Sequence, residues 1–200
     1  MSRKILETRK KILETASNLL LEGHGQGVRM ADIAREAGIS RQAVYLHFAS
    51  RAELMIATVR HLDEVNGLKE RLRKFDEETT GIGLLNAFID FWGNYIPEIY
   101  GVAKALMAAR ETDEAAAAAW KDRMDSIRSG CREVVEALKR DGSLTSEWDV
   151  DEAIDLFWTI LSIQNWELLT IECGWPISRY VEQIQKVVKS AFVRYESGLK

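Results

Sequence analysis

Residues 30–48 read MADIAREAGISRQAVYLHF, a stretch that predicts two short helices joined by a tight turn. Gly38 can adopt the left-handed conformation that such a turn requires, and small Ala34 lets the helices approach closely. Ser40 is a suitable N-cap for a second helix from 41 to about 48. The wedge between the helices is expected to be filled by two apolar side chains, Ile39 and Val44.

This pattern is typical of a helix-turn-helix, whose second helix directs its N-terminal end at DNA. The charge distribution agrees with a polyanion partner there. Residues 1–51 hold nine Lys/Arg against five Asp/Glu, whereas the remaining 149 hold 18 Lys/Arg against 26 Asp/Glu. We therefore expect a basic DNA-binding end on an acidic body.

The composition is that of a soluble globular protein, with 46% hydrophobic and 29% charged residues in 200. No run of eighteen apolar residues exists, and the charged N-terminus lacks an apolar signal core. Cys131 and Cys173 lie far apart and form no metal spacing. We expect a cytoplasmic protein with two ordinary thiols and no membrane partner.

Two prolines and thirteen glycines favour long helices over many short strands, so the predicted fold class is all-α. Gly23, Gly25 and Gly27 should end the first helix, and Pro97 suits the first turn of another. Hydrophobic periodicity and caps predict helices over 8–22, 30–37, 41–48, 50–75, 80–96, 97–110, 114–140, 150–173 and 178–196.

Four segments together resemble the TetR/AcrR family of bacterial transcriptional regulators: Asp32-Ile33-Ala34, Ala37-Gly38-Ile39-Ser40, Val44-Tyr45-Leu46-His47-Phe48 and Ser50-Arg51-Ala52-Glu53-Leu54. The resemblance is specific over about residues 10–58. It implies a homodimer with an N-terminal three-helix DNA-binding domain, here 1–51. It also implies a larger helical domain for ligand binding and dimerisation, here 52–200.

The resemblance also implies which residues meet DNA. Arg41, Gln42, Ala43 and Tyr45 match positions that meet base edges, and Arg and Gln suit guanine and adenine. Tyr45 and His47 match phosphate contacts, and Arg51 matches a cation at the start of the fourth helix. Tyr45 and His47 have the alternative of packing within the domain. The complete set of expected DNA-binding residues is Arg29, Ser40, Arg41, Gln42, Ala43, Tyr45, His47 and Arg51.

The sequence departs from the family at a few positions. Val28 and Arg29 stand where the family often has Thr or Ser, which weakens the N-cap of the second helix and removes a hydroxyl contact to phosphate. Arg29 supplies a cation in its place. Leu46 stands where a larger aromatic or polar residue is frequent.

An aromatic stretch in the acidic body is a candidate ligand site, because binding pockets are mostly apolar with a few polar groups. The alternative is that these side chains are plain core. The expected contacts to a small apolar or amphipathic ligand are Phe88, Phe91, Trp92, Tyr95 and Arg110. Asn86, Asp90 and His61 are further possible polar contacts, and the sequence does not select among the four polar residues.

The last two predicted helices carry apolar residues around most of their circumference. A second copy of the chain would cover such a surface, although one large monomer core is the alternative. The expected dimer contacts are Phe157, Leu161, Leu168, Ile184 and Val188.

Nothing in the sequence indicates an enzyme, a metal site or a cofactor: His24, His47 and His61 have no metal spacing, and no nucleophile elbow or phosphate loop occurs. The sequence therefore predicts a homodimeric, ligand-responsive transcription regulator. It would bind a near-palindromic double-stranded DNA operator, and the expected effect of binding is repression. The fourth helix would carry the ligand signal. The alternative is a DNA-binding structural or cell-division factor without a ligand.

Overall fold

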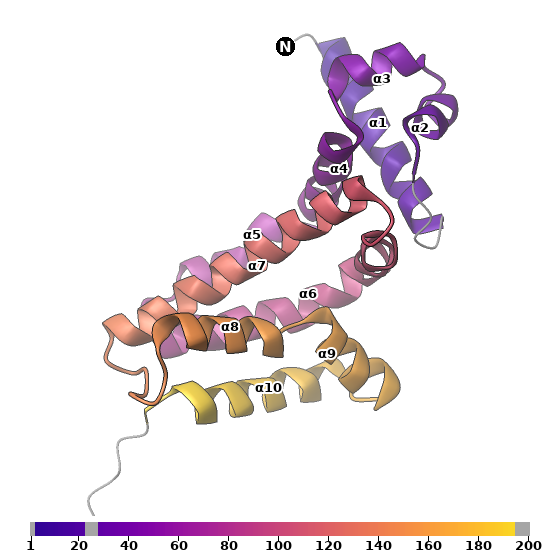
Figure 1. Ribbon diagram of the computed structural model, residues 1–200. Helices are drawn as coiled ribbons and strands as arrows, with labels where there is room; N and C mark the ends of the chain where they lie inside the picture. Colours follow the sequence, from indigo (N-terminus) through magenta and orange to yellow (C-terminus); the bar gives the residue numbers. More distant parts are fainter. Residues whose placement is uncertain (1–2, 23–27, 195–200) are drawn as a thin grey trace, which may run out of the picture. The chain divides into compact units, whose positions relative to one another are not determined.

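The computed structural model describes residues 3–22 and 28–194, and Figure 1 shows that they form an all-helical chain. Among these residues the only β-type pairing is an isolated bridge between Leu144 and Val193. The chain divides into two compact units. The expected helix stop at Gly23, Gly25 and Gly27 lies outside the described residues.

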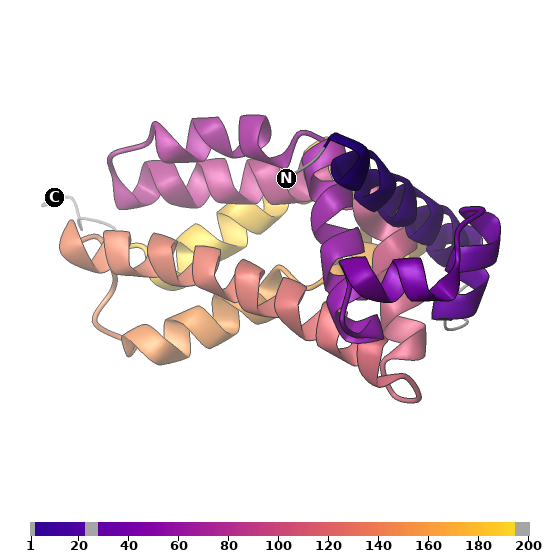
Figure 2. The ribbon, with the colours of Figure 1, turned by 90° about the horizontal axis from the view of Figure 1, so that it is seen from above.

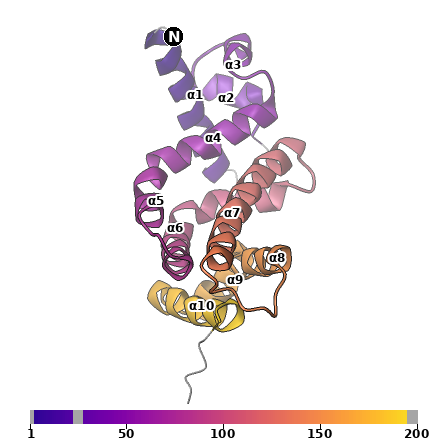
Figure 3. The ribbon, with the colours of Figure 1, turned by 90° about the vertical axis from the view of Figure 1, so that its left-hand side faces the viewer.

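The first unit comprises residues up to 68 together with 98–124. Its N-terminal helices are α1 (Arg3–Glu22), α2 (Met30–Glu36), α3 (Arg41–His47) and α4 (Arg51–Val65). Figure 3 shows α2 and α3 beside α1 and α4. Fully buried apolar side chains from all four helices and the turn after α3 form the core, among them Ile12, Ile33, Val44, Phe48 and Leu54.

The second unit comprises residues 69–97 and the chain from 125 onward. It contains α5 (Leu68–Asp76) from its second residue, the start of α6 (Gly81–Ala109) and most of α7 (Glu114–Arg140). It continues with α8 (Val150–Ile160), α9 (Ile163–Glu167), the π-helical turn η1 (Leu168–Glu172) and α10 (Ile177–Phe192). Its core is rich in rings: Phe88, Trp92, Phe157, Tyr180 and Phe192 are all buried.

Two expected helix boundaries are wrong. The predicted helix over 50–75 is interrupted after α4, where Gly67 adopts φ +69°, a conformation that only glycine takes readily. Conversely, Pro97 lies inside α6 and does not start a new helix. Proline removes one backbone donor, but it is exposed here, and the helix continues on both sides of it.

The predicted helix over 150–173 is also wrong, because it is three elements. α8 ends at Ile160, and the hydroxyl of Ser162 accepts a hydrogen bond from Asn165 N at 3.3 Å, which caps α9. The prediction over 114–140 is confirmed by α7 at both ends. No described helix is long and apolar enough to cross a membrane, and no described group of His, Cys, Asp and Glu could hold a metal ion.

Candidate nucleic-acid interface

The turn between α2 and α3 has the geometry that the sequence predicts. Gly38 adopts φ +63°, and a Cβ placed there would meet nothing within 4 Å, so the backbone angle and not lack of space calls for glycine. Ile39 N donates to Ala34 O at 3.0 Å, which closes the turn. Ser40 Oγ accepts from Ala43 N at 3.1 Å and caps α3. Ala34 and Val44 are buried where the two helices meet.

α3 buries one side chain, Val44, and exposes four of the other six. Arg41 and Gln42 are exposed, Tyr45 is 43% exposed, and Ala43 is half-buried. The Arg41 guanidinium lies over the Tyr45 ring, 5.7 Å from its centroid. The predicted base-reading residues therefore share one accessible face of a short helix. Leu46, a departure from the family pattern, is 83% exposed beside them.

The remaining predicted contacts surround α3. Ser40 is exposed, and its hydroxyl is used as the N-cap. His47 is half-buried in the last turn of α3. Arg29 is the exposed N-cap residue of α2 and makes no side-chain cap, which agrees with the weak cap that its sequence position predicts.

Arg51, the expected phosphate contact, does not stand free at the start of α4. Its Nε donates to Val28 O, and its Nη1 pairs with Asp113. Nη2 is buried with no partner among the described residues. Sequence inspection could not identify this partner, because Asp113 is 62 residues away in the chain. Arg51 therefore holds the segment before α2 and the turn before α7 against α4.

Asp113 is a residue of this region that sequence analysis missed. Its carboxylate accepts from Ala115 N at 3.0 Å and Ala116 N at 3.3 Å, so it caps α7 while it pairs with Arg51. Burial acts to raise the pKa of Asp113, but the hydrogen bonds from Arg51 and the two backbone groups outweigh it, and the pKa lies below its usual value. An acidic residue directly before a predicted helix start was the available signal.

A groove of about 1170 Å³ runs beside the recognition helix within the first unit. Its lining includes Arg29, Arg41 and Tyr45, together with residues 112–115 from the turn before α7 and the first residues of α7. Ser50 lies in this groove at the N-terminus of α4, where its hydroxyl accepts from Glu53 N at 3.1 Å. Four of the expected DNA contacts, Arg29, Arg41, Tyr45 and Arg51, thus line one concave surface with a helix N-terminus, which attracts anions.

Three of the four aromatic side chains of the predicted ligand pocket are buried in the second unit. Phe88, Trp92 and Tyr95 are 5%, 4% and 2% exposed. Trp92 Nε1 donates to Leu161 O at 2.7 Å, and the Phe88 ring packs so closely on Gly130 that an added Cβ would lie 2.6 Å from it. These three rings are packed core and cannot line a pocket in this conformation. Phe91 alone borders an open groove, and Arg110 lies over Trp120 in the other unit.

Four of the five expected dimer contacts are also buried within the chain. Phe157, Leu161, Ile184 and Val188 are 0% to 6% exposed, because they form the core of the second unit. Side chains without accessible surface cannot meet a partner. Leu168 is 56% exposed, and two further apolar side chains that the sequence analysis did not select are half exposed, Ile171 at 50% and Val187 at 53%.

Comparison with known proteins places this motif in a family. The model of the bacterial regulatory proteins of the tetR family matches residues 12–58, which cover most of α1 through the first half of α4. The chain is 31% identical over 83 residues to the HTH-type transcriptional regulator TtgR of Pseudomonas putida. That match covers 42% of this chain and 40% of TtgR, so the chain spans less than half the length of this relative.

Solved structures share the fold over nearly the whole chain. A transcriptional regulator from Saccharomonospora viridis, solved in complex with choline, has a TM-score of 0.71 at 17% identity and covers 94% of this chain and 99% of its own. NalD, the secondary repressor of the MexAB-OprM multidrug efflux pump in Pseudomonas aeruginosa, has a TM-score of 0.68 at 20% identity, with 98% and 100% covered.

These proteins are regulators and not enzymes. The helix-turn-helix, its capped second helix and the match over residues 12–58 lead to one assignment: this part of the chain is a DNA-binding domain of the bacterial regulatory proteins of the tetR family.

Proposed function

We propose that the chain is a homodimeric, ligand-responsive transcription regulator that binds a near-palindromic double-stranded DNA operator through α3 and acts as a repressor. One observation carries the proposal: α3 exposes Arg41, Gln42 and Tyr45 on one face while Val44 anchors its other face in the core. Arginine and glutamine are side chains that read base edges in the major groove. NalD, which has the same fold, is a repressor, and repression is the sign that we propose here.

The DNA contacts are divided by chemistry. Arg41, Gln42 and Ala43 would meet bases from the N-terminal part of α3, while Tyr45, His47 and Arg29 would meet phosphates. Ser40 would contribute through the capped start of the helix. We do not include Arg51 among these DNA contacts, because its guanidinium already donates to Val28 O and pairs with Asp113. Its proposed role is to stabilise the domain. Residues 1–51 would then act as the DNA-binding domain and 52–200 as the ligand-binding and dimerisation domain.

The dimer seam is proposed on exposed apolar side chains of η1 and α10. Leu168, Ile171 and Val187 are each at least half exposed, and η1 and α10 contact one another. A second copy would remove these side chains from water, and pairing of two recognition helices matches a two-fold operator. The test is the mass by light scattering. Leu168→Glu should yield monomers, whereas Leu46→Glu, at a leucine of α3 that is still more exposed, should leave the dimer intact.

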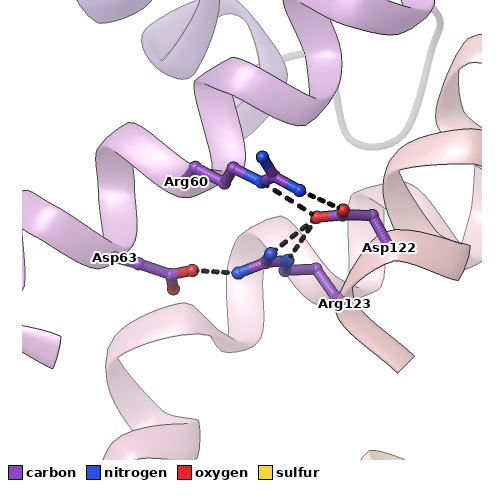
Figure 4. Close-up of polar contacts among 4 residues, drawn as sticks. All are labelled: Arg60, Asp63, Asp122 and Arg123. Carbon is purple, nitrogen blue, oxygen red and sulfur yellow. Dashed lines mark hydrogen bonds and ion pairs between the residues drawn. The ribbon is translucent and has the colours of Figure 1, made fainter. Parts of the chain in front are cut away.

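Ligand response requires an element whose position both sites influence. Two ion-pair groups that join α4 to α7 within the first unit support α4 in that role. Arg51 pairs with Asp113 at one end of α4. Near the other end, Figure 4 shows Arg60 donating to Asp122, which Arg123 also contacts, while Arg123 bonds Asp63. Arg60 Nη2 lies 2.5 Å from Asp122 Oδ1.

The second ion-pair group is strongly held. Asp63 is 7% exposed, and Asp122 bridges two guanidinium groups. Burial acts to raise the pKa of Asp122, but the hydrogen bonds from Arg60 and Arg123 outweigh it and keep the pKa below its usual value. With both ends paired, α4 would shift together with the first turns of α7. A ligand that displaces α7 would thereby move α4, the helix that directly follows the recognition helix α3 in the chain.

The experiment that tests DNA recognition selects binding sites from a random duplex library and then measures affinity across a salt series. Arg41→Ala should lose preference at particular base pairs, by roughly 1–3 kcal/mol at each. The control is Arg35→Ala, an exposed arginine of α2 that pairs with Asp32 at 3.0 Å, and it should retain the preference. Failure of the selection to yield a consensus, or equal effects of the two variants, would refute sequence-specific binding through α3.

A further inference from the structure

A second groove, of about 690 Å³, lies within the second unit between α5, α6 and α10. Figure 2 shows α5 running alongside the first part of α6. The floor comes from one face of α6, where Asn86, Asp90 and Phe91 recur at helical spacing, and small Ala87 between them leaves room. Gln185 of α10 closes one side.

The groove contains an acceptor in need of a donor. Asn86 Oδ1 is buried and has no hydrogen-bond partner among the described residues. The nearby Gln185 donates to the backbone oxygen of Asn86 at 3.1 Å and not to this side chain. A buried carbonyl oxygen without a donor is unfavourable. A ligand N–H or O–H group in the groove would satisfy this oxygen once the Asn86 side chain, which lines the groove, turns it outward.

The charges that line the groove are predominantly negative. Carboxylates outnumber guanidinium groups, with Glu70, Glu77, Glu78 and Asp90 against Arg71 and Arg73. Arg73 is already shared between Glu70 at 3.2 Å and Glu77 at 3.5 Å. The potential that remains favours a positive ligand and opposes an anion.

An aromatic platform completes the groove. Phe91 stacks on Tyr95 with centroids 5.4 Å apart and planes 23° apart. The Arg71 guanidinium already lies over the Tyr95 ring, 5.5 Å from its centroid. The chain itself therefore places a cation on one ring of this pair, Tyr95, and the half-buried Phe91 presents the other ring to the groove.

We infer that this groove binds a protonated organic amine with an aromatic or apolar body. The ammonium N–H groups would meet Asn86 Oδ1 and the Asp90 carboxylate, and the body would lie against Phe91. This inference rests on the proposed function, since the amine would be the ligand to which the regulator responds. It also moves the ligand site from the packed rings Phe88 and Trp92 to the open surface that Phe91 borders.

The test is calorimetric titration of the whole chain, without DNA, with three probes that share a phenyl ring. 2-Phenylethylamine is cationic at pH 7, 2-phenylethanol is neutral, and 3-phenylpropanoate is anionic. The amine should bind at least about fivefold more tightly than the alcohol, because it gains charge attraction and a cation–π contact. The anion should bind more weakly than either. Equal affinity for amine and alcohol, or tighter binding of the anion, overturns the inference.

Variants locate the binding. Asp90→Asn and Asn86→Ala should each reduce amine affinity by about three- to tenfold while leaving 2-phenylethanol almost unchanged. Phe91→Leu keeps an apolar side chain but should lose most of the preference for the cation. The matched control is Glu133→Gln, an exposed carboxylate on α7 outside the groove. If Glu133→Gln weakens amine binding as much as Asp90→Asn does, the site is not this groove.

Failure of the inference and failure of the proposed function are distinguishable. Amine binding that depends on Asp90, with no release of the selected duplex, supports the groove and refutes the ligand response. Specific DNA binding with no preference for the amine overturns the groove and leaves DNA recognition standing.

Discussion

The recognition helix α3 and the first half of α6 both carry side chains that could bind a ligand. α3 exposes most of them to solvent, whereas α6 buries most of them in the core. α3 has seven residues and buries only Val44. Between 84 and 96, α6 buries Leu84, Leu85, Phe88, Ile89, Trp92, Tyr95 and Ile96. A short helix at the edge of a small domain has one anchoring face, so its polar residues stay accessible. A long helix packed against several others buries its rings whatever their binding potential.

The largest expected effect on the free energy of unfolding is that of Trp92→Ala. The ring is 4% exposed, and its Nε1 donates to Leu161 O, so the substitution leaves a cavity and an unpaired carbonyl. The loss should be about 3–5 kcal/mol in urea denaturation. Phe91→Ala, on the half-buried ring of the same helix, is the control and should cost clearly less. Similar losses for the two variants would contradict the division between packed rings and groove.

Gly130→Ala tests the close packing of Phe88 at the residue against which its ring lies. Alanine favours a helix by up to about 1 kcal/mol, but its Cβ would lie 2.6 Å from the Phe88 ring. Overpacking should dominate, with a net loss of about 1–2 kcal/mol in the same assay. Gly101→Ala, at an exposed glycine within α6, should instead be neutral or stabilising. A stabilising Gly130→Ala would show that Phe88 can move aside.

The largely buried Arg51–Asp113 ion pair can be compared with an ion pair of an exposed arginine. A double-mutant cycle of Arg51→Ala and Asp113→Ala should give a coupling of about 1–2 kcal/mol, because the side chains are only 27% and 11% exposed. The exposed pair of Arg132 with Glu136 should couple by no more than about 0.5 kcal/mol. Arg51→Ala should weaken DNA binding without lowering its salt slope, because no phosphate contact is lost. If Arg51→Ala instead reduces the salt slope of DNA binding by about one, Arg51 does contact a phosphate.

The same pair has a pH dependence of known sign. Asp113 has a lowered pKa in the folded chain, so its contribution to stability is present above the ordinary carboxyl value of 3.8. It should be lost as the pH falls from there through the lower folded value. Urea denaturation of wild type and Asp113→Ala between pH 7 and pH 3 would measure it, and the difference between the two proteins should shrink only below about pH 4.

The smallest effect on stability is expected for the reading face of α3. Arg41→Ala and Gln42→Ala should change the free energy of unfolding by no more than about 0.5 kcal/mol, because both side chains are exposed. Their effect should appear only in the base preference of the bound DNA. A loss of stability above 1 kcal/mol in either variant would indicate that the face is structural.

Local chemistry explains what could be predicted. Helix α7 begins after Asp113 and ends with Lys139 and Arg140, and its capping and periodic signals lie within a few residues of its ends. The turn at Gly38 and the caps at Ser40 and Ser50 are likewise set by hydrogen bonds over three or four positions. By contrast, periodicity continued through Gly67 and Ser162, where the backbone turns out of the helix.

The sequence by itself determined the all-helical fold, the helix-turn-helix and its family, because these depend on caps, glycine angles and apolar spacing over short distances. Tertiary structure decided which cation faces outward and which is paired, and which rings border a groove. Arg41 and Arg51 are the same residue type ten positions apart, and only the partner 62 residues away distinguishes them. Burial of Phe88 against Gly130 and of Trp92 against Leu161 depends in the same way on long-range packing, which local sequence does not encode.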